Sequence, residues 1–342
     1  MTFVWFALIL LYLLTYVTLD GYDLGIGIAT LFEGAAGCRR QMLELVAVAW
    51  DGNETWLVLL GVALWAGFPL AFGTILPHAY LPLIVMLFSL IVRGVSVEMA
   101  SQKPPAPRWE RAFGAASLTA ALAQGAAAGT LAARLTVTSG AFHGPAFGAL
   151  GWFSALTAVT VACGYLALGY AYTKWKATGG LRAAAGRRGT VTAAAAVVLA
   201  AACLFAVNAT AAPLDLSPGR AFGFGWLLAF AAGGAVLALV TLRPGSRYDA
   251  LPTAGLVTAS VAVFLAVVVA RYPVLAPPGL TVGDAASPGR TMEFLAIGIG
   301  LDGPLILFYT WYAHYAFRGK QGRSSPRPPE GADPRLGATD DH

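Results

Sequence analysis

Residues 19–27 read LDGYDLGIG and residues 50–56 read WDGNETW, and both motifs lie against long apolar segments. Together they hold four carboxylates: Asp20, Asp23, Asp51 and Glu54. A charge within hydrocarbon costs about 2.5–3.5 kcal/mol on insertion scales, so acidic residues in such segments are rare unless they have a task. We therefore interpret the rest of the chain as a membrane scaffold that holds these side chains.

The composition is typical of a polytopic helical membrane protein. Of the 342 residues, 58% are hydrophobic and 11% are charged, whereas a soluble domain carries about 25% charged residues. The net charge of +5 does not indicate a nucleic-acid partner, because the basic residues lie in short turns between apolar runs. Cys38, Cys163 and Cys203 are far apart and form no CxxC motif, so we interpret them as small apolar packing residues.

Nine segments are apolar over about 20 residues, the length that a membrane-spanning helix needs. The predicted helices cover residues 3–32, 51–76, 79–97, 112–133, 147–172, 190–209, 222–242, 251–271 and 292–317. The first lacks the basic start and the cleavage site of a signal peptide, so we interpret it as a transmembrane helix. Residues 1–318 thus form one transmembrane domain, and residues 319–342, rich in Pro, Gly and charge, are predicted to be a disordered cytoplasmic tail.

The distribution of Lys and Arg predicts the orientation of the chain. Of the 22 basic residues, all but Arg134, Arg220, Arg271 and Arg290 lie after odd-numbered predicted helices, at a helix end there, or in the tail. Since cytoplasmic loops carry the excess of positive charge, the N-terminus is predicted to be outside and the C-terminus in the cytoplasm. Both acidic motifs then enter the membrane from the cytoplasmic side, on adjacent antiparallel helices.

The spacing of the four carboxylates suggests a proton path. Asp20 and Asp23 are three residues apart, as are Asp51 and Glu54, so each pair shares a helix face. A desolvated carboxylate can hold or release a proton near neutral pH. A row of such groups leading inward from the cytoplasmic face would conduct protons.

Other interpretations of the buried acids stay open at this stage. They could instead cap helix starts or pair with basic side chains, namely Arg39, Arg40 or Arg93. Asp302, which precedes Gly303 and Pro304 in the last predicted helix, could belong to a polar path or contact another subunit. Pro304 frees a backbone carbonyl and favours a kink there.

The chain shows no evident haem site. Axial haem ligands are imidazole or thioether groups held within the bilayer. The candidates are scattered and form no obvious pair: His78, His143, His314, His342, Met86 and Met292. We therefore expect no haem or other metal to be bound by this chain alone.

Taken together, the two acidic motifs resemble those of subunit II of the cytochrome bd-type quinol oxidases. The second motif continues as AWDGNETWLVLLGVALWAGFPLAF over residues 49–72. The likeness extends through YLPLI (80–84) and RG (93–94) to LFYTWY (307–312) and FRGK (317–320). The likeness covers nearly the whole chain. The two N-terminal motifs together are specific for the family, whereas the first motif alone would be a weak signal.

The resemblance implies a terminal respiratory oxidase of the bacterial cytoplasmic membrane that oxidises quinol and reduces oxygen to water. In that family the haems, b and d, and the quinol-oxidising loop are on subunit I. Subunit II binds no haem, supports assembly and lines a proton path from the cytoplasm. Some members hold a structural quinone in subunit II, and a small single-helix accessory subunit is a further possible partner.

The resemblance also implies roles for individual residues. By match to the family motifs, Asp23 and Asp51 are the proton-path carboxylates, with Asp20 and Glu54 as supporting members. Trp56 matches a tryptophan near a route for oxygen.

Two other functions remain open from the sequence. A stand-alone proton-coupled transporter is expected to show an internal two-fold repeat with broken helices at the midplane, whereas the acidic motif occurs once in this chain. A purely structural assembly subunit would hold the same carboxylates without moving protons.

Overall fold

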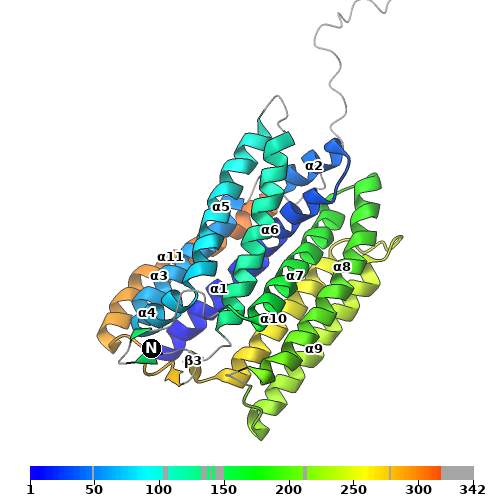
Figure 1. Ribbon diagram of the computed structural model, residues 1–342. Coiled ribbons are helices and arrows are strands. Elements are labelled where there is room, and N and C mark those ends of the chain that lie inside the picture. The colour runs from blue at the N-terminus through cyan, green and yellow to red at the C-terminus, as the bar shows by residue number, and fades with distance from the viewer. Residues whose placement is uncertain are drawn as a thin grey trace, which may run out of the picture.

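The computed structural model is a bundle of long helices (Figure 1). It describes residues 1–47, 50–102, 107–131, 137–138, 141–142, 150–210, 214–276 and 279–316. The predicted tail, residues 319–342, and the side chains of Asp302 and His314 lie outside this part of the chain.

The helices follow one another with short connections. They are α1 (Thr2–Leu31), α2 (Ala36–Val46), α3 (Trp50–Gly67), α4 (Pro69–His78), α5 (Tyr80–Ser101), α6 (Pro107–Thr130), α7 (Trp152–Lys176), α8 (Gly179–Ala206), the 3-10 turn η1 (Val207–Ala209), α9 (Pro218–Leu242), α10 (Leu251–Arg271) and α11 (Gly289–Ala316). Two small antiparallel pairs complete the described structure: β1 (Val137–Thr138) with β2 (Ala141–Phe142), and β3 (Val274–Ala276) with β4 (Leu280–Thr281).

Helix α1 is central to the bundle. It packs against α3, α6 and α7, while α5 lies against α6, α7 against α8, and α9 against α10. Every residue from Asp20 to Thr30 is buried. The first acidic motif therefore faces other helices on all sides, and its carboxylates are surrounded by protein.

Glycines of the first motif allow α1 to approach α7 closely. A Cβ atom on Gly25 would lie 1.7 Å from the carbonyl oxygen of Tyr165, and one on Gly169 would lie 2.2 Å from the carbonyl carbon of Gly25. Small residues at helix contacts permit such an approach in membranes. The same short motif thus supplies two carboxylates and the contact that brings α7 beside them.

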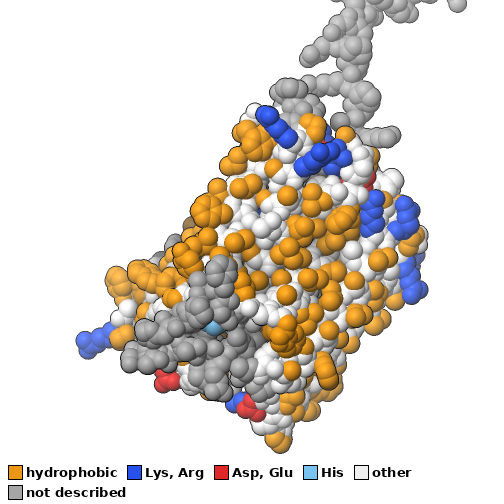
Figure 2. Space-filling model, in the orientation of Figure 1, with side chains coloured by type: hydrophobic (Ala, Val, Ile, Leu, Met, Phe, Trp, Pro, Cys, Tyr) orange, Lys and Arg blue, Asp and Glu red, His pale blue; other side chains and the backbone are white. Residues whose placement is uncertain are grey.

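The predicted all-helical membrane architecture is confirmed. Within the described residues seven helices are long and apolar enough to cross a membrane, and an eighth span is present if α2 and α3, which are bent by 49°, cross together. Hydrophobic side chains cover much of the face shown in Figure 2, while Lys and Arg side chains on this face gather at the end that holds α2 and the start of α8. The predicted count of nine spans and the orientation stay predictions.

The predicted single helix over residues 51–76 is wrong, because the chain breaks at Phe68 between α3 and α4. Pro69 begins α4; a proline has no backbone N–H and disfavours helical geometry in the residue before it. Phe68 accordingly has φ −137° and ψ 62°. The carbonyls of Ala66 and Gly67 accept hydrogen bonds from the side chain and backbone N–H of Ser287, at 2.7 and 2.9 Å.

Other parts of the helix assignment also differ from the sequence prediction. The charged link after the first helix contains α2, and α8 begins at Gly179, eleven residues before the predicted start at residue 190. Basic residues that were expected in a turn, Arg182 and Arg188, thus lie on a helix, where they pair with Asp249 and Glu33. Helix α11 runs without interruption through Pro304.

We predict that Gly25→Ala lowers the stability of the protein by about 1–3 kcal/mol, the usual cost of overpacking a core, because α1 and α7 must separate. Gly164→Ala is the matched control, since a Cβ atom there would meet nothing within 4 Å. Thermal unfolding midpoints in detergent measure the difference. A midpoint for Gly25→Ala equal to that of the control would contradict this packing.

Candidate functional site

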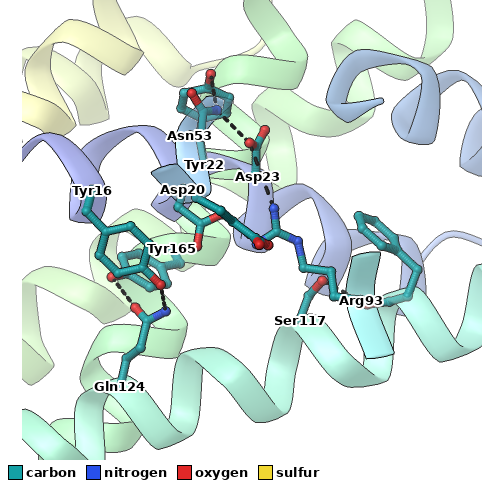
Figure 3. Close-up of polar contacts among 11 residues, drawn as sticks. Tyr16, Asp20, Tyr22, Asp23, Asn53, Arg93, Ser117, Gln124 and Tyr165 are labelled. Carbon is teal, nitrogen blue, oxygen red and sulfur yellow. Dashed lines mark hydrogen bonds and ion pairs between the residues drawn. The ribbon is translucent and has the colours of Figure 1, made fainter. Parts of the chain in front are cut away.

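Arg93 of α5 joins three of the four predicted carboxylates, and Figure 3 shows it beside two of them, Asp20 and Asp23. Its Nη1 atom lies 2.5 Å from Asp20 Oδ1 and 3.3 Å from Glu54 Oε1, and its Nη2 atom lies 4.0 Å from Asp23 Oδ2. Asp20 and Asp23 come from α1 and Glu54 from α3. We call these four residues the Arg93 cluster; it forms where three helices meet.

The Arg93 cluster is almost fully enclosed. Arg93 and Asp23 are 0% exposed and Asp20 is 1% exposed, whereas the side chain of Glu54 is 24% exposed. Asp23 Oδ1 and Arg93 Nε have no hydrogen-bond partner among the described residues. Buried polar atoms are nearly always paired in folded proteins, so unpaired ones within one ion cluster are a feature of functional sites.

Asn53 links the two acidic motifs directly. Its Nδ2 atom donates hydrogen bonds to Asp23 Oδ2 at 2.7 Å and to the Tyr22 hydroxyl at 3.1 Å. The Tyr22 ring stacks on that of Tyr172 in α7, with centroids 4.3 Å apart. Sequence reasoning missed Asn53, although an uncharged amide between two acids of an apolar helix is itself a signal of a polar partner.

A second branch of polar side chains joins α1, α6 and α7. Its members are Tyr16, Gln124 and Tyr165. Gln124 of α6 donates from Nε2 to the Tyr16 hydroxyl at 2.7 Å and accepts from the Tyr165 hydroxyl at Oε1 at 2.8 Å. Sequence reasoning missed this branch as well; its one signal is an amide in the small-residue run ALAQGAAAG.

Asp51 and Trp56 lie apart from the Arg93 cluster. Asp51 is exposed in the first turn of α3, one turn before Glu54. Trp56 is fully buried and its ring centroid is 5.8 Å from that of Tyr12. The structure therefore brings Asp20, Asp23 and Glu54 together, with Asp51 at the solvent-exposed start of the same helix as Glu54.

The three basic residues that the sequence offered as partners for the buried acids make different contacts. Arg93 pairs with the acidic motifs, as described above. Arg39 instead pairs with Glu110 at 2.9 Å, and Arg40 pairs with Glu44 at 3.5 Å. Of the three pairings that the sequence left open, the one between the buried acids and Arg93 is thus present.

No group of three His, Cys, Asp or Glu side chains in the described ranges has the arrangement of a metal site. His78 is buried, and its Nε2 atom lies 3.0 Å from the carbonyl oxygen of Thr130. The polar centre of the described structure is therefore an ion cluster built from carboxylates and one guanidinium.

Comparison with known proteins identifies the family. The family model for cytochrome bd terminal oxidase subunit II matches residues 1–317. The chain belongs to this family. The resemblance inferred from the two acidic motifs is confirmed.

Individual relatives of this cytochrome bd subunit II chain align over a shorter part. It is 35% identical to cytochrome bd-I ubiquinol oxidase subunit 2 of Escherichia coli K12 over 108 residues, which are 31% of this chain and 28% of that protein. It is 36% identical to cytochrome bd ubiquinol oxidase subunit 2 of Bacillus subtilis 168 over 95 residues, 28% of each chain. The aligned part is thus less than a third of these relatives.

A solved structure shares the fold of this subunit II chain. A chain in the structure of bd oxidase from Geobacillus thermodenitrificans superimposes with a TM-score of 0.73, over 93% of this chain and 99% of that one. The sequence identity is 16%. The two chains therefore share a fold over nearly their whole length.

We predict that Arg93→Met destabilises the protein by about 3–5 kcal/mol, because it leaves buried carboxylates without a counter-charge. Adding Asp20→Asn should recover part of this loss, since it removes one of the uncompensated charges. Arg40→Met is the matched control; its exposed ion pair contributes about 0–1 kcal/mol. Thermal unfolding of the purified variants tests this, and equal midpoints for Arg93→Met and Arg40→Met would contradict it.

Proposed function

We propose that this chain is the non-haem subunit of a quinol:oxygen oxidoreductase that reduces oxygen to water in the bacterial cytoplasmic membrane. Its partner is a subunit I that carries haem b and haem d and oxidises quinol. Membership of the subunit II family supports this assignment, as do the names of the relatives from Escherichia coli and Bacillus subtilis. A small accessory subunit and a structural quinone remain further expectations from the family resemblance.

We infer that the chain crosses the membrane nine times. Seven described helices qualify by length and composition, and the bent pair α2–α3 adds an eighth span. The ninth is α6, whose 24 residues are packed between α1, α5 and α7. A helix covered by neighbours needs less apolar surface than one facing lipid. The gathering of Lys and Arg at the end that holds α2 supports a cytoplasmic position for that end.

The proposed task of the acidic motifs is to admit protons from the cytoplasm. One observation carries this proposal: an exposed acid and a partly exposed acid, one turn apart on α3, are followed by two buried acids of α1 beside Arg93. Asp51 is exposed, Glu54 is 24% exposed at its side chain, and Asp23 and Asp20 are buried. A row of acids running from solvent into a protein-lined interior is the arrangement that proton relays use.

The charge balance of the Arg93 cluster supports proton binding within it. Three carboxylates share one guanidinium, so the cluster would carry two net negative charges if all three were ionised. An uncompensated buried charge costs several kcal/mol. A proton bound by one of these carboxylates lowers that cost, and a bound proton that can be exchanged is what a relay needs.

Trp56 is proposed to line a route for oxygen, by its match to the family motif. It is fully buried with Tyr12, Trp5 and Phe68 in an apolar cluster beside α1. An apolar interior suits the passage of a neutral, apolar gas. This role stands apart from the proton path, because the indole does not carry a titratable group.

A purely structural role is the second candidate, and the Arg93 cluster is the observation that favours it. Ion pairs between α1, α3 and α5 would hold these helices together without any proton movement. The proton path and the structural role assign different tasks to Asp51. Asp51 makes no salt bridge among the described residues, so its structural role would be limited to that of an acid in the first turn of α3, which stabilises a helix start.

We predict that Asp51→Asn and Glu54→Gln lower quinol-driven oxygen consumption by the assembled complex about tenfold, which corresponds to about 1.4 kcal/mol in the barrier. Proton uptake measured in proteoliposomes should fall in step. Glu44→Gln is the matched control, since this exposed acid of α2 pairs with Arg40 outside the cluster. Unchanged uptake in Asp51→Asn, with the complex intact, would leave the structural role as the better proposal.

We predict that the chain co-purifies from native membrane with a larger haem-bearing subunit. The absorbance spectrum of the complex should show bands of haem b and haem d, and the separated chain should show none. Isolation of the chain by itself in a transport-competent form would instead favour the stand-alone proton-coupled transporter.

A further inference from the structure

Asn53 is a buried amide between two acids of α3, and the proposed proton path gives it no task. The residue is 1% exposed. Its Nδ2 atom lies 2.7 Å from Asp23 Oδ2 and 3.1 Å from the hydroxyl oxygen of Tyr22, both on α1 (Figure 3). A side-chain amide nitrogen carries two hydrogens, so each of these two oxygens accepts one of them.

The chemistry of Asp23 fixes the orientation of this amide. An ionised carboxylate only accepts hydrogen bonds, so the nitrogen of Asn53, and not its oxygen, must face Asp23. The second acceptor is also held in place, because the Tyr22 ring stacks on that of Tyr172 with centroids 4.3 Å apart and an angle of 10° between the planes. A half-turn of the amide would direct its oxygen at the carboxylate. Asn53 is therefore a directed donor to Asp23.

The two carboxylate oxygens of Asp23 differ as a result. Oδ2 accepts a hydrogen bond from Asn53, whereas Oδ1 is buried and has no hydrogen-bond partner among the described residues. A proton on Oδ1 leaves the bond from Asn53 intact, because Oδ2 is then the carbonyl oxygen and still accepts. A proton on Oδ2 would instead place a hydroxyl group opposite the amide N–H. The hydrogen bonding of the site thus favours proton binding at Oδ1.

The guanidinium of Arg93 distinguishes the two buried acids from each other. Its Nη1 atom lies 2.5 Å from Asp20 Oδ1, whereas its Nη2 atom lies 4.0 Å from Asp23 Oδ2. The attraction between opposite charges weakens with distance. The charge of Asp23 is therefore balanced less closely than that of Asp20, and Asp23 is the buried acid better suited to exchange a proton.

We propose that Asn53 is a positioning residue: it holds Asp23 through Oδ2, so that Oδ1 is the atom that takes up and releases the proton. The inference rests on the proton path proposed above and assigns one of its steps to a single atom.

Infrared difference spectroscopy of the purified complex at two pH values tests this assignment. A protonated carboxyl group has a carbonyl band, and the frequency of this band falls when the carbonyl oxygen accepts a hydrogen bond. With the proton on Oδ1, the carbonyl oxygen of Asp23 is Oδ2, which Asn53 binds. We expect a pH-dependent carbonyl band that Asp23→Asn removes, and a shift of this band to higher frequency in Asn53→Leu.

Two further variants separate the loss of the donor from other effects. Tyr22→Phe removes the second acceptor of the amide and keeps the N–H that Asp23 accepts, so the band should stay at its original frequency. Asn208→Leu is the matched control, since Asn208 is exposed in η1 and the band should again be unchanged. Asn53→Ala replaces Asn53→Leu if that variant does not assemble, and the same shift is expected.

An unchanged band in the Asn53 variant would overturn the inference, as would the lack of any pH-dependent band that Asp23→Asn removes. A shift in Tyr22→Phe as large as that in Asn53→Leu would also overturn it, because the shift would then report repacking beside Asp23. The band reports on Asp23 itself. The expected shift therefore supports the positioning role even if Asp51→Asn leaves proton uptake intact and the proton path is abandoned.

Discussion

A single buried guanidinium constrains most of this structure. Arg93 is 0% exposed, so its charge must be balanced by acids that are brought to it from other helices. Asp20 and Asp23 come from α1 and Glu54 from α3, and these helices are fixed in register with α5 by that requirement. The interaction explains why acids are tolerated within such apolar segments. Three carboxylates face this one guanidinium, and the resulting excess of negative charge is the basis of the proposed proton binding.

The glycines of the first motif complement this electrostatic constraint. Gly25 brings α7 against α1, and α7 carries Tyr172, whose ring stacks on that of Tyr22. Tyr22 and Asp23 both bind the amide of Asn53. Without the close approach, lipid or side chains of α1 would fill this space. The short segment from Asp20 to Gly27 therefore sets both the charge of the site and the walls around it.

Much of the architecture could be predicted from the sequence, because it depends on composition and local pattern. The apolar runs predict spanning helices, and the paired acids predict a polar site on α1 and α3. The role of Arg93 as a hub could not be predicted, since it depends on the register between helices far apart in sequence. Asn53 and Gln124 were missed because uncharged amides give no periodic signal. The break at Phe68 had a signal in Pro69, but the continuous apolar run outweighed it.

The contact of Ser287 with the end of α3 joins two parts of the chain that are far apart in sequence. The carbonyls of Ala66 and Gly67 are freed where α3 stops, and their donor lies 221 residues further along the chain. Unsatisfied carbonyls are costly in lipid. A substitution that removes the hydroxyl donor at Ser287 therefore acts on the break between α3 and α4, although it lies in the segment before α11.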